Sequence, residues 1–217
     1  MQSVSADTFC ADVPCHVIGM FPGELITEDC GTAAGIDVQK DILKIAVVER
    51  HKGSGRIGIG YLHGYGLQRG AVATSVAHDA HNLIVIGTNE ADMAAAANRV
   101  LADHGGIAVA EHARILAAVP LEIAGLMSTA PLETVDTQLE EAKTQAFRLG
   151  VHHGVDPFMT LSFMPLPVIP KLRITTRDVY DVNRQQLINR ILTDPGNFCG
   201  FSGERISGCP RSARRSD

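Results

Sequence analysis

Residues 43–93 read LKIAVVERHKGSGRIGIGYLHGYGLQRGAVATSVAHDAHNLIVIGTNEADM, and this stretch decides the expected fold. Its first part, 43–49, is rich in β-branched residues, which is typical of a strand buried on both faces. Seven glycines follow between Arg50 and Gly70 at irregular spacing, and predict short strands joined by tight turns. Leu83–Gly87 (LIVIG) predicts another strand, so this part of the chain is expected to be β-rich.

The flanking segments predict one more strand and a first helix. Residues 16–27 are another β-branched run, whereas residues 1–15 show no period and are expected to form a linker or the remnant of an upstream domain. Asn89 is a suitable cap for the alanine-rich segment that follows it, and the glycine pair 105–106 is a suitable stop. A helix is therefore expected between these two signals.

A second helix is expected over residues 131–149, with Pro131 in its first turn and Gly150 after its end. Its apolar stripe consists of Leu132, Val135, Leu139, Ala142 and Ala146. Residues 106–121 predict a hairpin that turns near 112–114, and the proline-punctuated segment 156–175 is expected to be extended. Strands and helices without regular alternation predict an α+β fold with mixed or antiparallel sheets, two main helices and no TIM barrel.

Composition limits the classes of function. The chain has 217 residues, a formal net charge of −5 and a pI of about 6.0, which argues against partners such as nucleic acid or an anionic membrane. No apolar run approaches the roughly 20 residues of a membrane span, and the N-terminus lacks the pattern of a secretory signal. The five cysteines form no C-x-x-C pair, so a reduced, cytoplasmic protein is expected.

Two short strings concentrate the side chains that carry chemistry. SVAHDAHN contains His78, Asp79, His81 and Asn82, and ERH contains Arg50 and His51 at the end of a predicted buried strand. Imidazole and carboxylate groups move protons near neutral pH and bind metals. A spacing of three places the two histidines of SVAHDAHN on one side of a helical turn but on opposite faces of a strand. Buried without a partner, Arg50 would be costly, so it is expected to meet a carboxylate, a phosphate or solvent.

Structural interpretations of the same residues stay open. The histidine string is also what a hydrogen-bonded turn or a buried polar network contains, and Arg50 with His51 is also compatible with a structural salt bridge. An independent metal site formed by His51, His78, Asp79 and His81 is a third alternative. No glycine-rich dinucleotide or phosphate loop is present.

The chain resembles adenine deaminase, in the part of that enzyme that follows its amidohydrolase barrel. The resemblance rests on PGELITED (22–29), the long string that spans 40–93, PLEIAGLMS (120–128) and DPFMTLSFMPLPVIPKLRIT (156–175). It extends from Val17 to Val182 in the family's order and implies a C-terminal domain over 16–183. Residues 184–217 do not look like the family's ending, and their composition predicts a flexible tail.

The resemblance implies hydrolysis of adenine to hypoxanthine and ammonia, in purine salvage, by a barrel that holds a divalent metal such as manganese or iron. This chain contains no H-x-H pair of the kind that binds the barrel's metal, so we expect an incomplete enzyme that depends on an amidohydrolase barrel as its partner. Catalytic roles are expected for His78, Asp79 and His81, and substrate-binding roles for Arg50, His51 and Asn82, with no metal ligand in this chain. The alternative is a non-catalytic packing or oligomerisation domain, and a homo-oligomer is expected.

Overall fold

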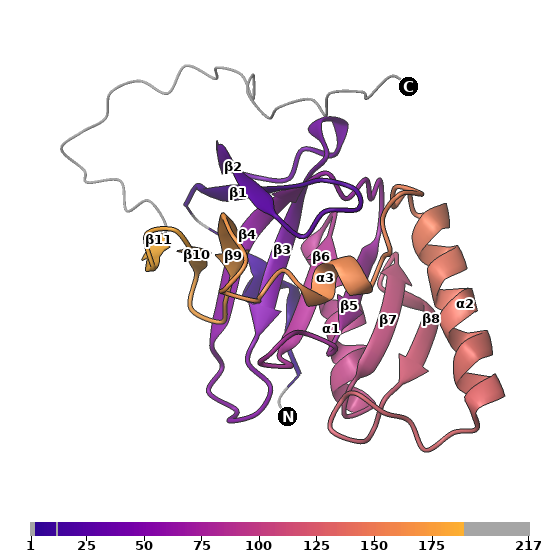
Figure 1. Ribbon diagram of the computed structural model, residues 1–217. Coiled ribbons are helices and arrows are strands. Elements are labelled where there is room, and N and C mark those ends of the chain that lie inside the picture. The colour runs from indigo at the N-terminus through magenta and orange to yellow at the C-terminus, as the bar shows by residue number, and fades with distance from the viewer. Residues whose placement is uncertain (1–2, 12, 189–217) are drawn as a thin grey trace.

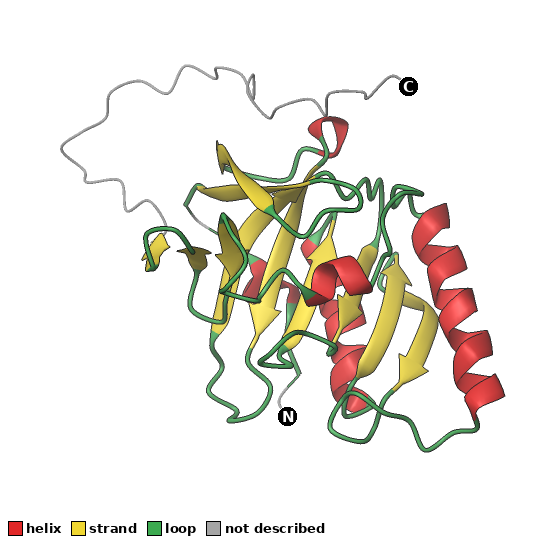
Figure 2. Ribbon diagram, in the orientation of Figure 1, coloured by secondary structure: helices red, strands yellow, loops and turns green. Residues whose placement is uncertain are grey.

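The structure is a computed structural model that describes residues 3–11 and 13–188 (Figure 1). Residues 189–217, most of the predicted tail, lie outside the described residues. A large sheet forms the middle of the molecule, with a helix against one face and two helices and a small sheet against the other (Figure 2). The large sheet is open, with a strand edge at either side, so the fold is α+β and closes no barrel.

The order of the strands across the large sheet differs from their order along the chain. Across the large sheet, the strands are β2 (Thr27–Ala33), β1 (Cys15–Met20), β4 (Ile57–His63), β3 (Ile42–Val48), β6 (Leu83–Gly87), β5 (Ala71–Thr74), β7 (Gly106–Glu111) and β8 (Arg114–Pro120). The small sheet contains β11 (Gln186–Ile188), β10 (Val179–Asp181) and β9 (Leu172–Ile174). The helices are α1 (Glu90–Ala102), α2 (Leu132–Arg148) and α3 (Met159–Ser162), with single turns η1 (Ala6–Phe9) and η2 (Val38–Lys40). Only β1 and β4 pair in parallel among these described strands.

The central strand β3 is buried along its whole length, as its sequence predicts. Ile45 and Val47 face the core beneath α2 and α3, whereas Ala46 and Val48 face the core beneath α1. Both faces of the sheet are covered, which explains why the strand reads as a continuous apolar run and does not alternate.

Helix α1 begins where the capping signal predicts. The side chain of Asn89 accepts a hydrogen bond from the backbone N–H of Asp92 (2.9 Å), which satisfies a donor that the first turn leaves free. The predicted face of α2 is confirmed at Ala142 and Ala146, which are fully buried. Leu132 departs from the predicted stripe, because it occupies the first turn, beyond the edge of the core, with 78% of its surface exposed.

The hairpin of β7 and β8 is confirmed, and it turns at His112 and Ala113, both with positive φ. Segment 156–175 contains no long helix, as expected, but it includes the short helix α3 in place of an extended chain. The carboxylate of Asp156 accepts the N–H groups of Phe158 (3.0 Å) and Met159 (2.8 Å), and this local capping starts the turn.

Residues 3–11, within the segment expected to be a linker, lie against α1. The side chain of Asn98 exchanges two hydrogen bonds of 2.8 Å with the backbone of Val4, and Phe9 is fully buried beside the helix. This contact brings the N-terminal end of the described chain to the lower edge of the large sheet (Figure 1).

Candidate functional site

The two polar strings meet at one end of the large sheet. Strands β3 and β6 are antiparallel neighbours, and Val48 pairs with Leu83 at the last position of their ladder. The chain that leaves β3 at Arg50 therefore lies beside the chain that enters β6 at Asn82. The Oδ1 atom of Asn82 accepts the backbone N–H of Arg50 at 3.3 Å. Strand pairing thus brings together two segments that lie about thirty residues apart in the sequence.

A tight turn holds His81. Its backbone N–H donates to the carbonyl of Ala77 at 2.7 Å, and its Nδ1 atom lies 3.4 Å from the backbone N–H of Ala77. The φ angle of His81 is 46°, so the residue adopts the left-handed conformation that closes such turns. The ring centroids of His78 and His81 lie 6.5 Å apart, with their planes inclined at 65°.

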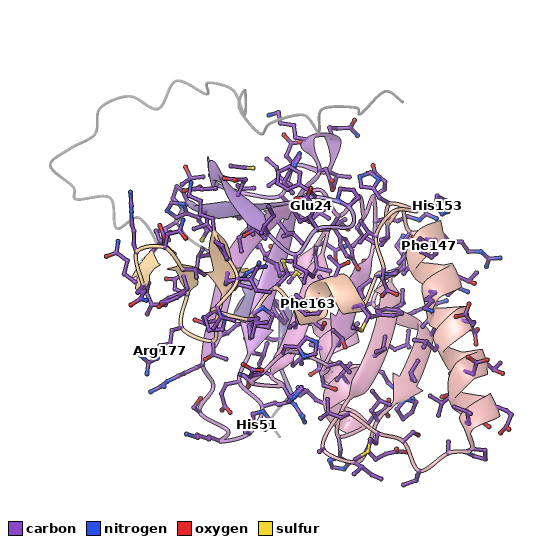
Figure 3. All side chains as sticks on the ribbon, in the orientation of Figure 1. Glu24, His51, Phe147, His153, Phe163 and Arg177 are labelled. Atoms are coloured by element: carbon purple, nitrogen blue, oxygen red, sulfur yellow. The ribbon has the colours of Figure 1, made fainter. Side chains whose placement is uncertain are left out.

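His78 connects this turn to helix α3. Its backbone N–H donates to the carbonyl of Ser162 at 2.9 Å, and its ring packs on Phe163 with a centroid distance of 4.6 Å. Figure 3 shows Phe163 over the middle of the molecule and His51 at its lower end. The site residues therefore extend from the lower edge of the sheet towards α3. Asp79, between the histidines, is exposed.

Arg50 contacts backbone carbonyl oxygens and no carboxylate among the described residues. Its Nε donates to the carbonyl of His81, one terminal nitrogen donates to Ala124, and the other lies 3.5 Å from the carbonyl of His104. The expected partners of Arg50 were a carboxylate, a phosphate or solvent. In the structure its hydrogen-bond acceptors are backbone carbonyl oxygens, and the residue remains partly exposed. Partial burial lowers the pKa of Arg50, although the group stays charged at physiological pH.

Glu49, which sequence reasoning did not single out, organises the loop that carries His51. Its carboxylate accepts the N–H groups of His51 (2.6 Å), Lys52 (2.7 Å) and Ser54 (3.0 Å). These hydrogen bonds, led by the one from Ser54, lower the pKa of Glu49 to about 2. The signal available in the sequence was a glutamate followed by a short Gly-Ser turn, a setting in which side chains bind the local backbone.

The imidazole of His51 is exposed, and its Nε2 donates to the carbonyl of Ala80 at 2.7 Å. Burial lowers the pKa of His81, and the neighbouring His78, Arg50 and His51 lower it further. A lowered pKa favours the neutral form of the His81 ring, the form that can take up a proton. This electrostatic setting is the main chemical property of the site.

Ser75, also missed by sequence reasoning, fixes the loop next to the site. This fully buried hydroxyl, at the end of β5, donates to the carbonyl of Gly125 at 2.7 Å and accepts the N–H of Gly106 at 2.7 Å. Gly125 lies so close to Arg50 that a Cβ atom on it would be 2.4 Å from the guanidinium. A small hollow of about 150 Å³ opens beside these contacts, lined by Arg50, Val100, Leu101, His104 and Gly105.

The geometry does not match a metal centre. Across residues 3–11 and 13–188, no group of three or more His, Cys, Asp or Glu side chains is placed to hold an ion. Nε2 of His51 and Nδ1 of His81 face backbone groups, and His78 packs on Phe163. The described residues therefore do not form the independent metal site of His51, His78, Asp79 and His81 that the sequence left as an alternative. In the same part of the chain, no helix combines the length and apolar character required to cross a membrane.

Comparison with known proteins gives the family. The profile of a family described as the adenine deaminase C-terminal domain matches residues 24–186. An adenine deaminase of Desulfatibacillum aliphaticivorans is 54% identical over 147 residues, which cover 68% of this chain and 26% of that protein. Adenine deaminases of Dehalococcoides mccartyi and Rhizobium johnstonii are 48% and 44% identical, each over 79% of this chain and 31% of the relative. The chain spans less than a third of the length of these relatives. The conclusion is that this chain belongs to the adenine deaminase C-terminal domain family.

Proposed function

We propose that this domain serves the hydrolytic deamination of adenine to hypoxanthine and ammonia, and that its polar cluster lines the mouth of the active site of an amidohydrolase barrel. The supporting observation is the meeting of Arg50 and His51 with His81 and Asn82 at one end of the sheet. Such polar side chains beside flexible turns suit a substrate-facing surface. The proposal includes purine salvage in the cytoplasm as the setting of the reaction.

The individual roles follow from the free atoms of each side chain. Asn82 uses Oδ1 for Arg50, and its Nδ2 amino group has no hydrogen-bond partner among the described residues, so it is available to a purine ring nitrogen. Asp79 is exposed and offers carboxylate oxygens to an amino group. His81, with its lowered pKa, accepts a proton, and His78 lies close enough to share this role through an intervening water.

Arg50 and His51 belong to the same surface. The guanidinium holds the turn of His81 and the loop at Ala124, and so places the imidazole of His81 beside them. The exposed ring of His51 is the substrate-facing member of this pair. The barrel is the part that would hold a divalent metal, manganese or iron, whose chemistry is the activation of water.

Two experiments test the proposal. The first measures ammonia release from adenine by the purified 217-residue chain, with manganese, iron or zinc added, and no turnover is expected. Metal-dependent turnover would contradict the need for a barrel and would indicate a catalytic site within this chain.

The second experiment uses the full-length relative from Desulfatibacillum aliphaticivorans, at the positions that align with His78 and His81. Replacement of either by Asn is expected to lower kcat about 100-fold, the usual contribution of a proton-transfer group, while the unfolding temperature stays unchanged. The matched control is the position of His153, which stacks on Phe147 at the opposite end of the molecule (Figure 3). Unchanged kinetics in both site variants would refute the catalytic role.

A second candidate function, an assembly domain, is supported by a different surface. Leu25, Ile26 and Val168 are exposed, and the backbones of their two loops are joined where Thr27 and Pro170 form a hydrogen bond of 3.0 Å. Exposed apolar side chains that gather in this way are typical of protein interfaces. Size-exclusion chromatography of the chain with Val168→Asp tests this candidate, which predicts a shift from oligomer to monomer.

A further inference from the structure

The loop that follows β8 is held rigidly at the end of the molecule that carries the polar cluster. The hydroxyl of Ser75 binds the carbonyl of Gly125 at 2.7 Å, and the guanidinium of Arg50 binds the carbonyl of Ala124. At the start of the loop, the N–H of Leu121 donates to the carbonyl of Gly105 at 3.1 Å. A connection with this many anchors has a fixed shape, whereas most surface loops are mobile.

This rigid loop presents two large apolar side chains to solvent. Ile123 and Met127 form an antiparallel bridge, with hydrogen bonds of 2.9 and 3.1 Å between their backbones. Side chains of directly paired residues project to the same side, so the two form one apolar surface, called here the 123/127 surface. Ile123 is 44% exposed and Met127 is 57% exposed, so the loop presents both side chains together to solvent.

The 123/127 surface lies at the end where the described chain begins. Ser3, Val4 and Leu101 line one hollow of about 220 Å³, and Leu101 also lines the adjoining hollow at Arg50. The second hollow reaches Gly105, where a Cβ atom would lie only 2.2 Å from the Cα of Gly125. The hollow at Arg50 therefore lies between the N-terminal segment and the strand–loop contact of Gly105 with Gly125. Figure 1 shows the N-terminal segment and the loop at the lower end of the molecule.

We propose that the 123/127 surface is the docking site for the catalytic domain that precedes this region in full-length adenine deaminases. In the relatives, the matched region is 31% of the protein or less, and the family is C-terminal, so the larger part of the enzyme precedes it. A preceding domain reaches this domain through its N-terminal segment, which lies at the same end of the molecule as the loop (Figure 1). The inference rests on the proposed function only in taking a catalytic domain as the partner.

The proposal gives Arg50 a positioning role. The same guanidinium donates to the carbonyl of His81 and to the carbonyl of Ala124. Docking of the catalytic domain at the loop is therefore coupled through Arg50 to the position of the turn that carries His81. A catalytic domain seated on Ile123 and Met127 would lie next to the polar cluster, because Ala124 is the residue that Arg50 contacts.

The test compares two proteins that carry the same change. In the 217-residue chain, the double variant Ile123→Asp with Met127→Asp is expected to unfold at the parent's temperature, since both residues are exposed. In the full-length Desulfatibacillum relative, the aligned double variant is expected to show two separate unfolding transitions by calorimetry, where the parent shows one. Hydrogen exchange at the aligned loop is expected to rise at least tenfold. The comparison variant is Val168→Asp on the other apolar surface, where 70% of Val168 is exposed. Whether or not it alters assembly, it is expected to leave a single unfolding transition and unchanged exchange at the aligned loop.

Three outcomes would overturn the proposal. A single transition and unchanged exchange in the full-length double variant would show that the catalytic domain sits elsewhere. Domain separation caused by Val168→Asp would assign docking to that other surface. A dimer of the isolated chain that Met127→Asp converts to monomer would assign the 123/127 surface to a second copy. If the aspartates unfold the isolated chain, the milder Met127→Gln replaces them in both proteins. Because these readouts do not depend on turnover, the docking site and the catalytic role of the histidines fail or stand separately.

Discussion

Arg50 donates through Nε to the backbone carbonyl of His81, thirty-one residues further along the chain. With its terminal nitrogens, the same side chain reaches Ala124 and His104, so one guanidinium joins the end of a strand, a turn and two loops. Planar geometry with several donors is what allows arginine to bind oxygens in different directions at once.

Arg50→Lys is expected to destabilise the chain by about 2 kcal/mol, because an ammonium cannot reach all of these carbonyls and roughly two hydrogen bonds of ~1 kcal/mol are lost. The measurement is urea unfolding followed by circular dichroism. Arg56→Lys is the matched control, since Arg56 is exposed and forms no ion pair among the described residues. Equal midpoints for the two variants would contradict the role assigned to Arg50.

The pH dependence of His81 supplies a second prediction. Its folded pKa lies below the ordinary value of 6.5, chiefly because of burial, with further lowering by His78 and other cations. The unfolded chain therefore binds the proton more tightly than the folded chain. The stability associated with the neutral ring is fully present above pH 6.5 and is lost as the pH falls through the lowered folded pKa.

This titration can be followed by NMR at the imidazole C2 proton of His81. In the variant His78→Asn, the midpoint is expected to rise towards 6.5, because the repulsion between the two rings is removed. A midpoint that stays in place in this variant would mean that His78 does not contribute to the lowered pKa of His81. A midpoint above 6.5 in the parent chain would reverse the sign of the predicted pH effect.

The ion pair of Lys44 and Glu90 joins β3 to the first turn of α1. The side chain of Lys44 is 5% exposed, so Glu90→Gln would leave an ammonium in the interior without its carboxylate. Because a third of Glu90 is exposed, we expect a loss of about 2–3 kcal/mol, somewhat less than for a fully buried pair. Glu140→Gln, which breaks the exposed pair with Lys143, is expected to cost less than ~1 kcal/mol. Thermal unfolding at neutral pH separates these outcomes, and similar losses in both variants would contradict the prediction.

Gly105 provides a prediction about backbone packing. Its φ is +140°, and a Cβ atom would lie 2.2 Å from the Cα of Gly125, so Gly105→Ala must displace main chain. We expect a loss of about 3 kcal/mol or more, from overpacking combined with backbone strain. Gly53→Ala has the same change of side chain and a φ of +60°, but in open space, and is expected to cost about 1 kcal/mol. Urea unfolding compares the cost of backbone strain alone, in Gly53→Ala, with the cost of strain plus steric collision, in Gly105→Ala. Equal losses of stability in the two variants would contradict the close contact between Gly105 and Gly125.

Much of the fold was predictable because its elements depend on local signals. The continuous apolar run at β3, the cap at Asn89 and the glycine stop near α1 each express a short-range preference of the chain. The short helix α3 was missed because it depends on a single aspartate cap within a segment rich in proline. Leu132 was placed in the core by its spacing, but only the end of the neighbouring sheet decides where burial stops.

The candidate site, like the fold, was predictable from the sequence only in part. The sequence predicted which residues carry chemistry, because imidazole, carboxylate, amide and guanidinium groups were concentrated in two short strings. It could not predict that Glu49 shapes the loop of His51 or that Ser75 anchors Gly125. Those contacts depend on which backbone groups the tertiary fold places near each side chain, and no local residue pattern specifies that placement.

By itself, the sequence determined the class of the fold, the extent of the resemblance and the set of polar residues, since each of these follows from residue type and spacing. Only the tertiary structure decided that Arg50 contacts carbonyl oxygens, that burial lowers the pKa of His81, and that Ile123 and Met127 stand exposed on a fixed loop. The physical reason is that hydrogen-bond partners, desolvation and exposure are properties of three-dimensional neighbours. The pairing of β3 with β6 brings those neighbours together across long stretches of sequence.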